Sequence, residues 1–172
     1  TDCTGWTVRD MLGHLLGMFA LQADPEERAR QITTAAELAG RSGELRINEM
    51  TALQVREHAD LGVDQLRRAL HEAGLRGLAA RRGLPAEVRA APYDSELPGE
   101  GMWTVGYLFD VIHMRDPWLH RVDICRATGR ELRRRGGGER RRALRRQGQV
   151  LDVPRRAALH RARLEPAPRI GH

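Results

Sequence analysis

Apolar residues recur every three or four positions through most of the first 128 residues, and this spacing constrains the fold more than any other feature. It places apolar side chains on one face of a helix, whereas a half-buried strand needs strict alternation. No segment alternates convincingly, and the sequence contains no internal repeat and no glycine-rich phosphate-binding motif. The sequence therefore predicts an all-α domain.

Capping residues mark where two of these helices begin. Thr7 and Asp10 have the spacing of a capping box, which predicts a helix over 7–23. Asp24 followed by Pro25 is the pattern of a helix N-cap and first turn, so a second helix is expected to begin there.

Glycines predict where the helices end. Gly40 can end the second helix, Gly74 a long helix over 48–74, and Gly129 a final helix over 104–128. We expect three of the helices to be members of one antiparallel bundle: 7–23, 48–74 and 104–128.

The C-terminal segment differs sharply in composition from the rest of the chain. Residues 1–131 contain 16 arginines and 20 acidic residues, whereas 132–172 contain 13 arginines and three acidic residues, and lysine is absent. The net charge of +6 therefore comes from the tail, and the acidic body argues against nucleic-acid binding. We predict a domain over 1–131 and an irregular Arg/Gly/Pro-rich tail over 132–172, either disordered or read out of frame from a GC-rich gene.

The cysteines and the apolar runs indicate the cellular compartment. Cys3 and Cys125 are too few for a disulfide framework. No apolar run approaches the ~20 residues of a membrane span, and no secretory signal is visible. We therefore expect a cytoplasmic protein that does not associate with a membrane.

Three side chains form a candidate metal site. Asp116 and His120 are four residues apart, so they lie within ~40° of one another on a helix and can bind one divalent ion, although a solvated hydrogen-bonded pair is the commoner meaning of this spacing. His14 has apolar neighbours on the first helix and is either a core histidine or, if the two helices pack together, a third ligand. Three protein ligands leave a coordination position open, as in catalytic sites.

The other histidines are weaker candidates. His113 shares the helix face of His120 and is either a fourth ligand or a hydrogen-bond donor to a ligand. His58 and His71 have charged neighbours, so we expect both to be exposed to solvent and not to bind metal. Besides zinc, a histidine and carboxylate ligand set also suits nickel, iron or manganese.

Two segments carry a family resemblance that covers residues 1–131. Residues 1–17 read TDCTGWTVRDMLGHLLG and residues 114–131 read MRDPWLHRVDICRATGRE. Both resemble signature segments of the mycothiol-dependent maleylpyruvate isomerase-like proteins, in the DinB/YfiT-like metal-binding superfamily. The resemblance implies a four-helix bundle whose first helix, before the Cys-Gly-Trp motif, is expected to be missing here. It also implies one divalent ion, usually zinc, bound by His14, Asp116 and His120.

The resemblance implies roles for several neighbours of these ligands. Trp6 is expected to be a packing anchor, Gly5 a turn and Cys3 a structural residue. Asp123 either orients His120 or pairs with Arg126 at the surface. Pro117 departs from the family pattern, and we expect it to kink the helix beside Asp116.

The resemblance also implies an activity. In that activity a metal-bound thiol, mycothiol, becomes the nucleophile of an isomerase or thiol S-transferase that acts on an electrophilic small molecule such as maleylpyruvate. The alternative is a non-catalytic metal-binding domain or a damaged remnant of such an enzyme. Beyond substrate and thiol, the expected partner is a second copy of the chain, bound through an exposed face of the bundle.

Overall fold

The structure is a computed structural model that describes residues 3 and 5–132, all within the first of two units, Thr1–Leu132. Apart from Leu132, the tail predicted over 132–172 lies outside the described residues. The all-α prediction is confirmed. The helical elements are α1 (Val8–Ala23), α2 (Pro25–Ser42), α3 (Arg46–Glu57), α4 (Val63–Arg82), α5 (Ala86–Ala90), α6 (Val105–Tyr107), a π-helical turn (Leu108–Ile112) and α7 (His113–Thr128).

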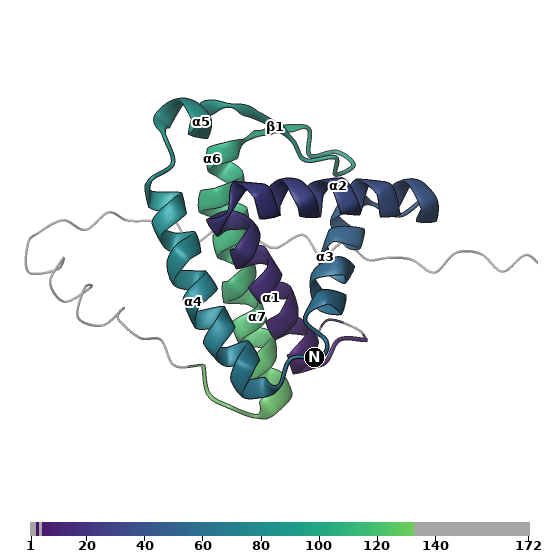
Figure 1. The fold of residues 1–172 in the computed structure, drawn as a ribbon, viewed down its shortest axis with the longest axis vertical. Coiled ribbons are helices and arrows are strands. Elements are labelled where there is room, and N and C mark those ends of the chain that lie inside the picture. The colour runs from purple at the N-terminus through teal and green to yellow at the C-terminus, as the bar shows by residue number, and fades with distance from the viewer. Residues whose placement is uncertain (1–2, 4, 133–172) are drawn as a thin grey trace, which may run out of the picture. The chain divides into compact units, whose positions relative to one another are not determined.

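Helix α1 is the element around which the others pack. Helices α3, α4 and α7 lie alongside it, and α2 runs across one end of this group (Figure 1). Along the chain, α1 and α4 run in one direction while α3 and α7 run in the opposite direction (Figure 1). As a result, one face of α1 meets α7, which comes about a hundred residues later in the sequence.

The predicted helix starts are confirmed in detail. The backbone N–H of Asp10 donates to Thr7 Oγ1 at 3.2 Å, and the Thr7 N–H donates to the Asp10 carboxylate at 2.7 Å. At the start of α2, the Asp24 carboxylate accepts hydrogen bonds from the next two free backbone N–H groups. These caps satisfy donors that would otherwise lack partners at the helix ends.

The prediction of a single helix over 48–74 is wrong. The chain leaves helical geometry at His58 and resumes it after Gly62, which divides the segment into α3 and α4. Gly74 does not end α4 but lies inside it, and a Cβ at this position would make an ordinary van der Waals contact with the Phe19 ring at 3.9 Å. Gly77 is closer still to α1: its Cβ would be 3.2 Å from the Phe19 carbonyl oxygen. Gly77, where a Cβ would be tight against the α1 backbone, thus allows α4 to approach α1, and neither glycine ends a helix.

Two smaller predictions also fail. Gly40 does not end α2, which continues to Ser42 and ends at Gly43 in the left-handed conformation, φ 76°. The sequence shows no strand signal, yet a short antiparallel hairpin pairs β1 (Pro92–Asp94) with β2 (Met102–Thr104). Strands of three residues are too short for an alternating pattern to be recognised.

The apolar core lies between α1 and α4. It comprises Leu16, Leu66 and Ala73, with Phe19 among the side chains packed against it. Within the described residues, no helix is long and apolar enough to cross a membrane. Helix α7 instead exposes several large apolar side chains, among them Met114, Trp118 and Leu119. The homodimer expected through an exposed face stays a prediction.

Candidate metal centre

His14 occupies a buried position in the middle of α1. It is 8% exposed, and the side chains around it on α1, such as Leu15 and Leu16, are also buried. Its Nδ1 atom lies 2.7 Å from the side-chain oxygen of Gln54 on α3. Its Nε2 atom points to the opposite side of the ring, toward α7.

Helix α7 supplies the other two predicted ligands. Asp116 Oδ2 lies 2.8 Å from His14 Nε2, and Asp116 Oδ1 lies 3.6 Å from His120 Nε2. The two imidazole rings are 5.2 Å apart between centroids and nearly perpendicular. One ligand atom from each of these residues lies within 4.8 Å of the other two. The structure therefore brings His14, Asp116 and His120 together from two helices.

Trp6 forms one wall of this cluster. Its ring contacts His14 edge-on at 5.6 Å and stacks near His120 at 6.2 Å between centroids. Gly5, which precedes it, has φ +82°, a conformation that side chains other than glycine rarely adopt. The turn at Gly5 therefore directs Trp6 onto the two histidines. Trp6 covers the cluster and also anchors the segment that precedes α1.

The cluster keeps Asp116 in its ionised form. Burial alone would raise the pKa of this carboxyl, but the hydrogen bond from His14 and the nearby charges of His14 and His120 lower it overall. A carboxylate between two imidazoles is a suitable donor set for a divalent cation, because it combines a negative charge with two neutral nitrogen ligands.

His113 lies one helical turn before Asp116, but its surroundings differ from those of the cluster. Its ring packs against Phe109 at 5.2 Å, and burial lowers the pKa of His113 to about 4. Its Nδ1 atom is buried without a hydrogen-bond partner within the described part of the chain. His113 is not part of either group of potential ligand atoms that the described residues form.

Asp123 and Cys3 lie on the far side of His120. Asp123 Oδ2 is 3.4 Å from His120 Nδ1, which is within ion-pair distance, but Nδ1 makes no hydrogen bond among the described residues, and the orienting role of Asp123 stays a prediction. Cys3, His120 and Asp123 also bring ligand atoms within 4.8 Å of one another. Sequence reasoning missed this second group, because only the folded chain brings Cys3 next to α7.

The two histidines expected in solvent differ from each other. His71 is exposed on α4, as predicted. His58 is only half-buried rather than exposed, and its Nδ1 lies 2.7 Å from the backbone carbonyl oxygen of Gln54, to which it can donate. The sequence pattern could not show this, because His58 ends α3 instead of continuing a long helix.

The kink expected at Pro117 stays a prediction, and a different irregularity lies five to nine residues before it. Helix α7 continues through Pro117, and the departure from α geometry is the π-helical turn at Leu108–Ile112, where the His113 N–H donates to the Leu108 carbonyl. Widened turns of this kind occur often beside functional sites. Here the widened turn leads directly into the helix that carries Asp116 and His120.

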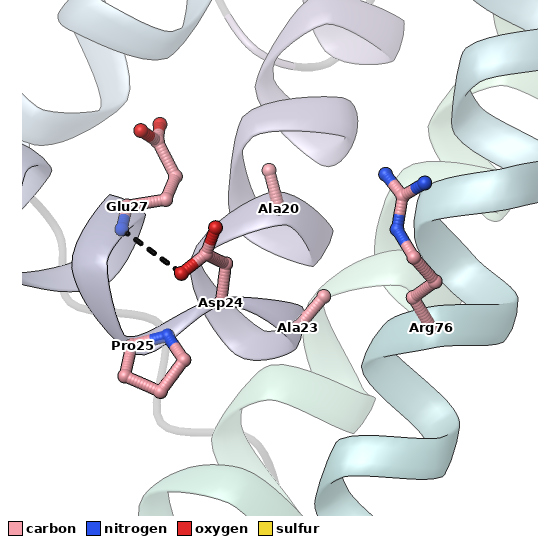
Figure 2. Close-up of a pocket in the computed structure, with 6 residues that line it drawn as sticks. All are labelled: Ala20, Ala23, Asp24, Pro25, Glu27 and Arg76. Atoms are coloured by element: carbon pink, nitrogen blue, oxygen red, sulfur yellow. Dashed lines mark hydrogen bonds between the residues drawn. The ribbon is translucent and has the colours of Figure 1, made fainter.

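A surface depression lies at the junction of α1 and α2 (Figure 2). Its nearest lining residue on α1 is Ala20, six positions beyond His14 and thus roughly 9 Å along the helix axis. No residue of the cluster lines the depression, which is therefore a separate feature. Its acidic groups already serve other roles, since Asp24 caps α2. Its lining residues are Ala20, Ala23, Asp24, Pro25, Glu27 and Arg76.

The fold and the cluster together define a class: an all-α bundle domain with a histidine on one helix facing an Asp-x-x-x-His pair on another. The sequence profile described as the mycothiol maleylpyruvate isomerase N-terminal domain matches residues 1–125. The chain therefore belongs to this family, as the two signature segments indicated. No curated protein and no solved structure shows a significant match to the chain.

Proposed function

We propose that this domain binds one divalent metal ion, zinc being the expected one, through His14, Asp116 and His120. We further propose that it acts with mycothiol as a thiol-dependent isomerase or S-transferase on an electrophilic small molecule such as maleylpyruvate. The observation that carries the proposal is the convergence of the three donor groups from α1 and α7. Membership of a family described by a mycothiol-dependent isomerase supports the thiol and the reaction class.

Each residue of the cluster has a separate role in this proposal. His14 and His120 present ring nitrogens, and Asp116 presents an ionised carboxylate between them. When bound, the ion supplies positive charge that stabilises a thiol in its deprotonated, nucleophilic form. Trp6 packs over both histidine rings and excludes water from that side of the cluster. Asp123 lies against the outer nitrogen of His120 and limits rotation of this ring.

The metal site is tested by elemental analysis of single alanine variants. We expect about one ion per chain in the wild type and loss of the ion in His14→Ala, Asp116→Ala and His120→Ala. His71→Ala is the matched control, because His71 is exposed on α4 and lies outside the cluster. Full occupancy in His14→Ala would contradict a site shared between α1 and α7.

The reaction is tested separately, with the metal-loaded chain and a set of low-molecular-weight thiols. We expect turnover of maleylpyruvate or a related electrophile only when a thiol is added, and loss of turnover in Asp116→Ala. One ion per chain without thiol-dependent turnover would favour the alternative, a metal-binding domain that is not catalytic.

A further inference from the structure

Behind His14, a row of buried side-chain amides leads away from the cluster. Gln54 Oε1 lies 2.7 Å from His14 Nδ1, and Gln54 Nε2 donates to Gln31 Oε1 at 2.8 Å. Gln31 Nε2 donates to the Gly17 carbonyl oxygen at 3.1 Å and to the Glu27 carboxylate at 2.8 Å. The row therefore connects α1, α3 and α2 through side chains that come from three different helices.

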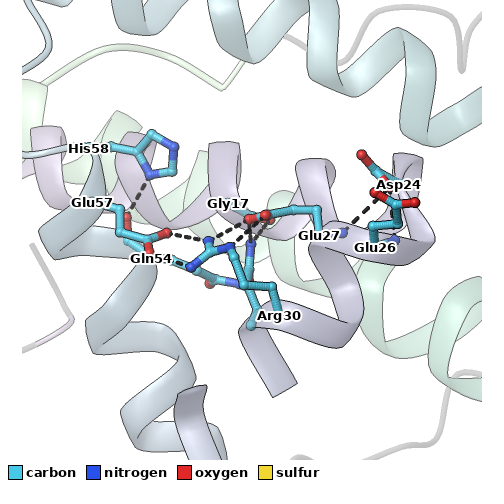
Figure 3. A network of polar contacts seen from close by, with 9 residues as sticks. Gly17, Asp24, Glu26, Glu27, Arg30, Gln54, Glu57 and His58 are labelled. Atoms are coloured by element: carbon cyan, nitrogen blue, oxygen red, sulfur yellow. Dashed lines mark hydrogen bonds and ion pairs between the residues drawn. The ribbon is translucent and has the colours of Figure 1, made fainter. Parts of the chain in front are cut away.

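The acceptors at the far end of the row determine how its amides are oriented. The Gly17 carbonyl and the Glu27 carboxylate can only accept hydrogen bonds, so the NH₂ group of Gln31 must point toward them. Glu27 is held as a carboxylate because Arg30 donates to both of its oxygens (Figure 3). Gln31 therefore presents its oxygen to Gln54.

The orientation of Gln31 determines that of Gln54 and the position of a hydrogen on His14. Because Gln31 presents an oxygen, Gln54 must present its NH₂ group to Gln31 and its own oxygen to His14. An amide oxygen can only accept, so Nδ1 of His14 must carry the hydrogen. Nε2, the nitrogen that faces Asp116, is then the one left for a metal ion, which would take the place of the hydrogen that Nε2 donates to the Asp116 carboxylate.

Burial makes this arrangement hard to reverse. Gln54 is 2% exposed and Gln31 is fully buried, so water cannot replace a lost partner. Rotating either amide by half a turn would set donor against donor or acceptor against acceptor, at a cost of about 1–3 kcal/mol for each buried group left unsatisfied.

The helix backbone leaves room for the row only because residue 17 is glycine. A Cβ on Gly17 would be 2.5 Å from Gln54 Cγ and 2.7 Å from Gln54 Cβ, so any side chain there would displace Gln54. His58 also fixes the backbone of Gln54, because its Nδ1 lies 2.7 Å from the Gln54 carbonyl oxygen (Figure 3). Both contacts keep Gln54 against α1 at the level of His14.

We infer that Gln54 is the positioning residue of the metal centre: its amide oxygen holds the hydrogen on His14 Nδ1 and directs Nε2 to the ion, and Gln31 fixes the amide of Gln54. The inference rests on the proposed metal site. It predicts that a change behind His14, with no contact to the ion, alters metal affinity.

The first test measures Zn²⁺ affinity by competition with a chelator. Gln54→Met keeps the length of the side chain but removes the acceptor, and we expect it to weaken Zn²⁺ binding by about 10–100-fold. Gln54→Glu retains an acceptor for Nδ1 but sets a carboxylate oxygen against Gln31 Oε1, so we expect a smaller loss of Zn²⁺ affinity than in Gln54→Met. Gln31→Met, which does not touch His14, should give a smaller loss of the same sign.

Gln22→Met is the matched control for these variants. Gln22 is also 2% exposed and lies on α1, but its side-chain nitrogen has no hydrogen-bond partner among the described residues. Its replacement should leave Zn²⁺ affinity unchanged. Wild-type affinity in Gln54→Met, or an equal loss in Gln22→Met and Gln54→Met, would overturn the inference.

The second test reads the ring of His14 directly. In ¹⁵N–¹H correlation spectra of the metal-free protein, we expect a hydrogen on Nδ1 in the wild type and in Gln22→Met. In Gln54→Met the signal of the Nδ1 hydrogen should be lost, while Nε2 keeps the hydrogen that the Asp116 carboxylate accepts. A wild-type ring without a hydrogen on Nδ1 would overturn the inference even if zinc binds.

The two measurements separate this inference from the proposed function. A wild-type chain that binds no Zn²⁺ but carries the hydrogen on Nδ1 refutes the proposed metal site and leaves the role of Gln54 toward His14 standing. A chain that binds Zn²⁺ with the same affinity after Gln54→Met supports the metal site and refutes the positioning role.

Discussion

Helices α1 and α7 carry the two halves of the same cluster, yet they are embedded very differently. Nine residues of α1 are buried, His14 among them, whereas His120 is the single buried residue of α7. Helix α7 leaves Met114, Trp118 and Leu119 at least 40% exposed. The α1 half of the site is therefore fixed by the core, while the α7 half is held to a large extent by contacts within the cluster.

The difference in burial between α1 and α7 indicates how the site is assembled. His14 is held in place by Gln54 and by the core residues around it, before any contact with α7 is considered. Asp116 contacts His14 on α1, and His120 stacks near Trp6, which lies just before α1. A ligand that binds all three groups would therefore stabilise the position of α7 more than that of α1.

The largest effect that we expect is on the free energy of unfolding. Removing an apolar side chain should lower it far more in the core between α1 and α4 than on α7. Leu66 on α4 is fully buried against α1, so Leu66→Ala should lower the free energy of unfolding by about 2–5 kcal/mol. Leu119 on α7 is 42% exposed, and Leu119→Ala should change it by no more than about 0.5 kcal/mol. Urea unfolding of both variants gives the values. Similar losses in the two would show that α7 is packed as tightly as α1.

The next prediction concerns pH, through His113 at the start of α7. Burial lowers the pKa of His113 to about 4 in the folded chain, while an unfolded chain has an ordinary pKa of about 6.5. Between these values the unfolded chain binds a proton that the folded chain excludes, so stability falls as the pH drops through this range. The full effect is about 3 kcal/mol. Unfolding of the metal-free chain between pH 7 and pH 4 measures it.

His113→Leu is the control for this pH dependence, since leucine cannot bind the proton and fits an apolar site beside Phe109. Its stability should change much less between pH 6.5 and pH 4. Below that range Asp116 contributes in the same direction, because its lowered pKa stabilises the fold only while the carboxyl is ionised. Equal slopes in the wild type and in His113→Leu would show that His113 is open to water.

Binding of Zn²⁺ should reduce the difference in local stability between α1 and α7. Zn²⁺ at about 100 times its dissociation constant should add about 2.7 kcal/mol to the free energy of unfolding. Because two of the three proposed ligands lie on α7, amide hydrogen exchange should slow more in α7 than in α1. His120→Ala should abolish both effects, whereas His71→Ala should retain them. Uniform slowing along the chain would contradict a loosely held α7.

The sequence predicted the parts of the fold that depend on local signals. The capping box at Thr7, the Asp24-Pro25 start of α2 and the end of α7 at Gly129 each depend on a few neighbouring residues, and all three are confirmed. Gly74 has the same local signal as a helix end, yet it lies inside α4, beside the Phe19 ring of α1. Such a contact between helices leaves no mark in a single sequence.

The same distinction applies to the candidate site. The four-residue spacing of Asp116 and His120 is visible in the sequence. The sequence pattern left His14 as either a core histidine or a third ligand, and the family resemblance favoured the ligand. The groups that surround them were not predicted: Gln54, Gln31 and Cys3 come close to the cluster only when distant segments pack together. A glutamine on a helix is usually exposed to solvent, so nothing in its neighbours marks Gln54 as buried.

The smallest effects that we expect come from replacing two glycines inside helices with alanine. In α1, a Cβ on Gly17 would come within 2.5 Å of Gln54 Cγ, close to the backbone of α3, so relief requires α3 or the whole Gln54 side chain to move. Gly17→Ala should therefore lower the free energy of unfolding by about 1–3 kcal/mol, although alanine favours helix. In α2, a Cβ on Gly40 would meet nothing within 4 Å, so Gly40→Ala should raise it by about 0.4–1 kcal/mol. Thermal unfolding of the two variants measures both changes, and a stabilised Gly17→Ala would show that α3 does not press against α1 behind His14.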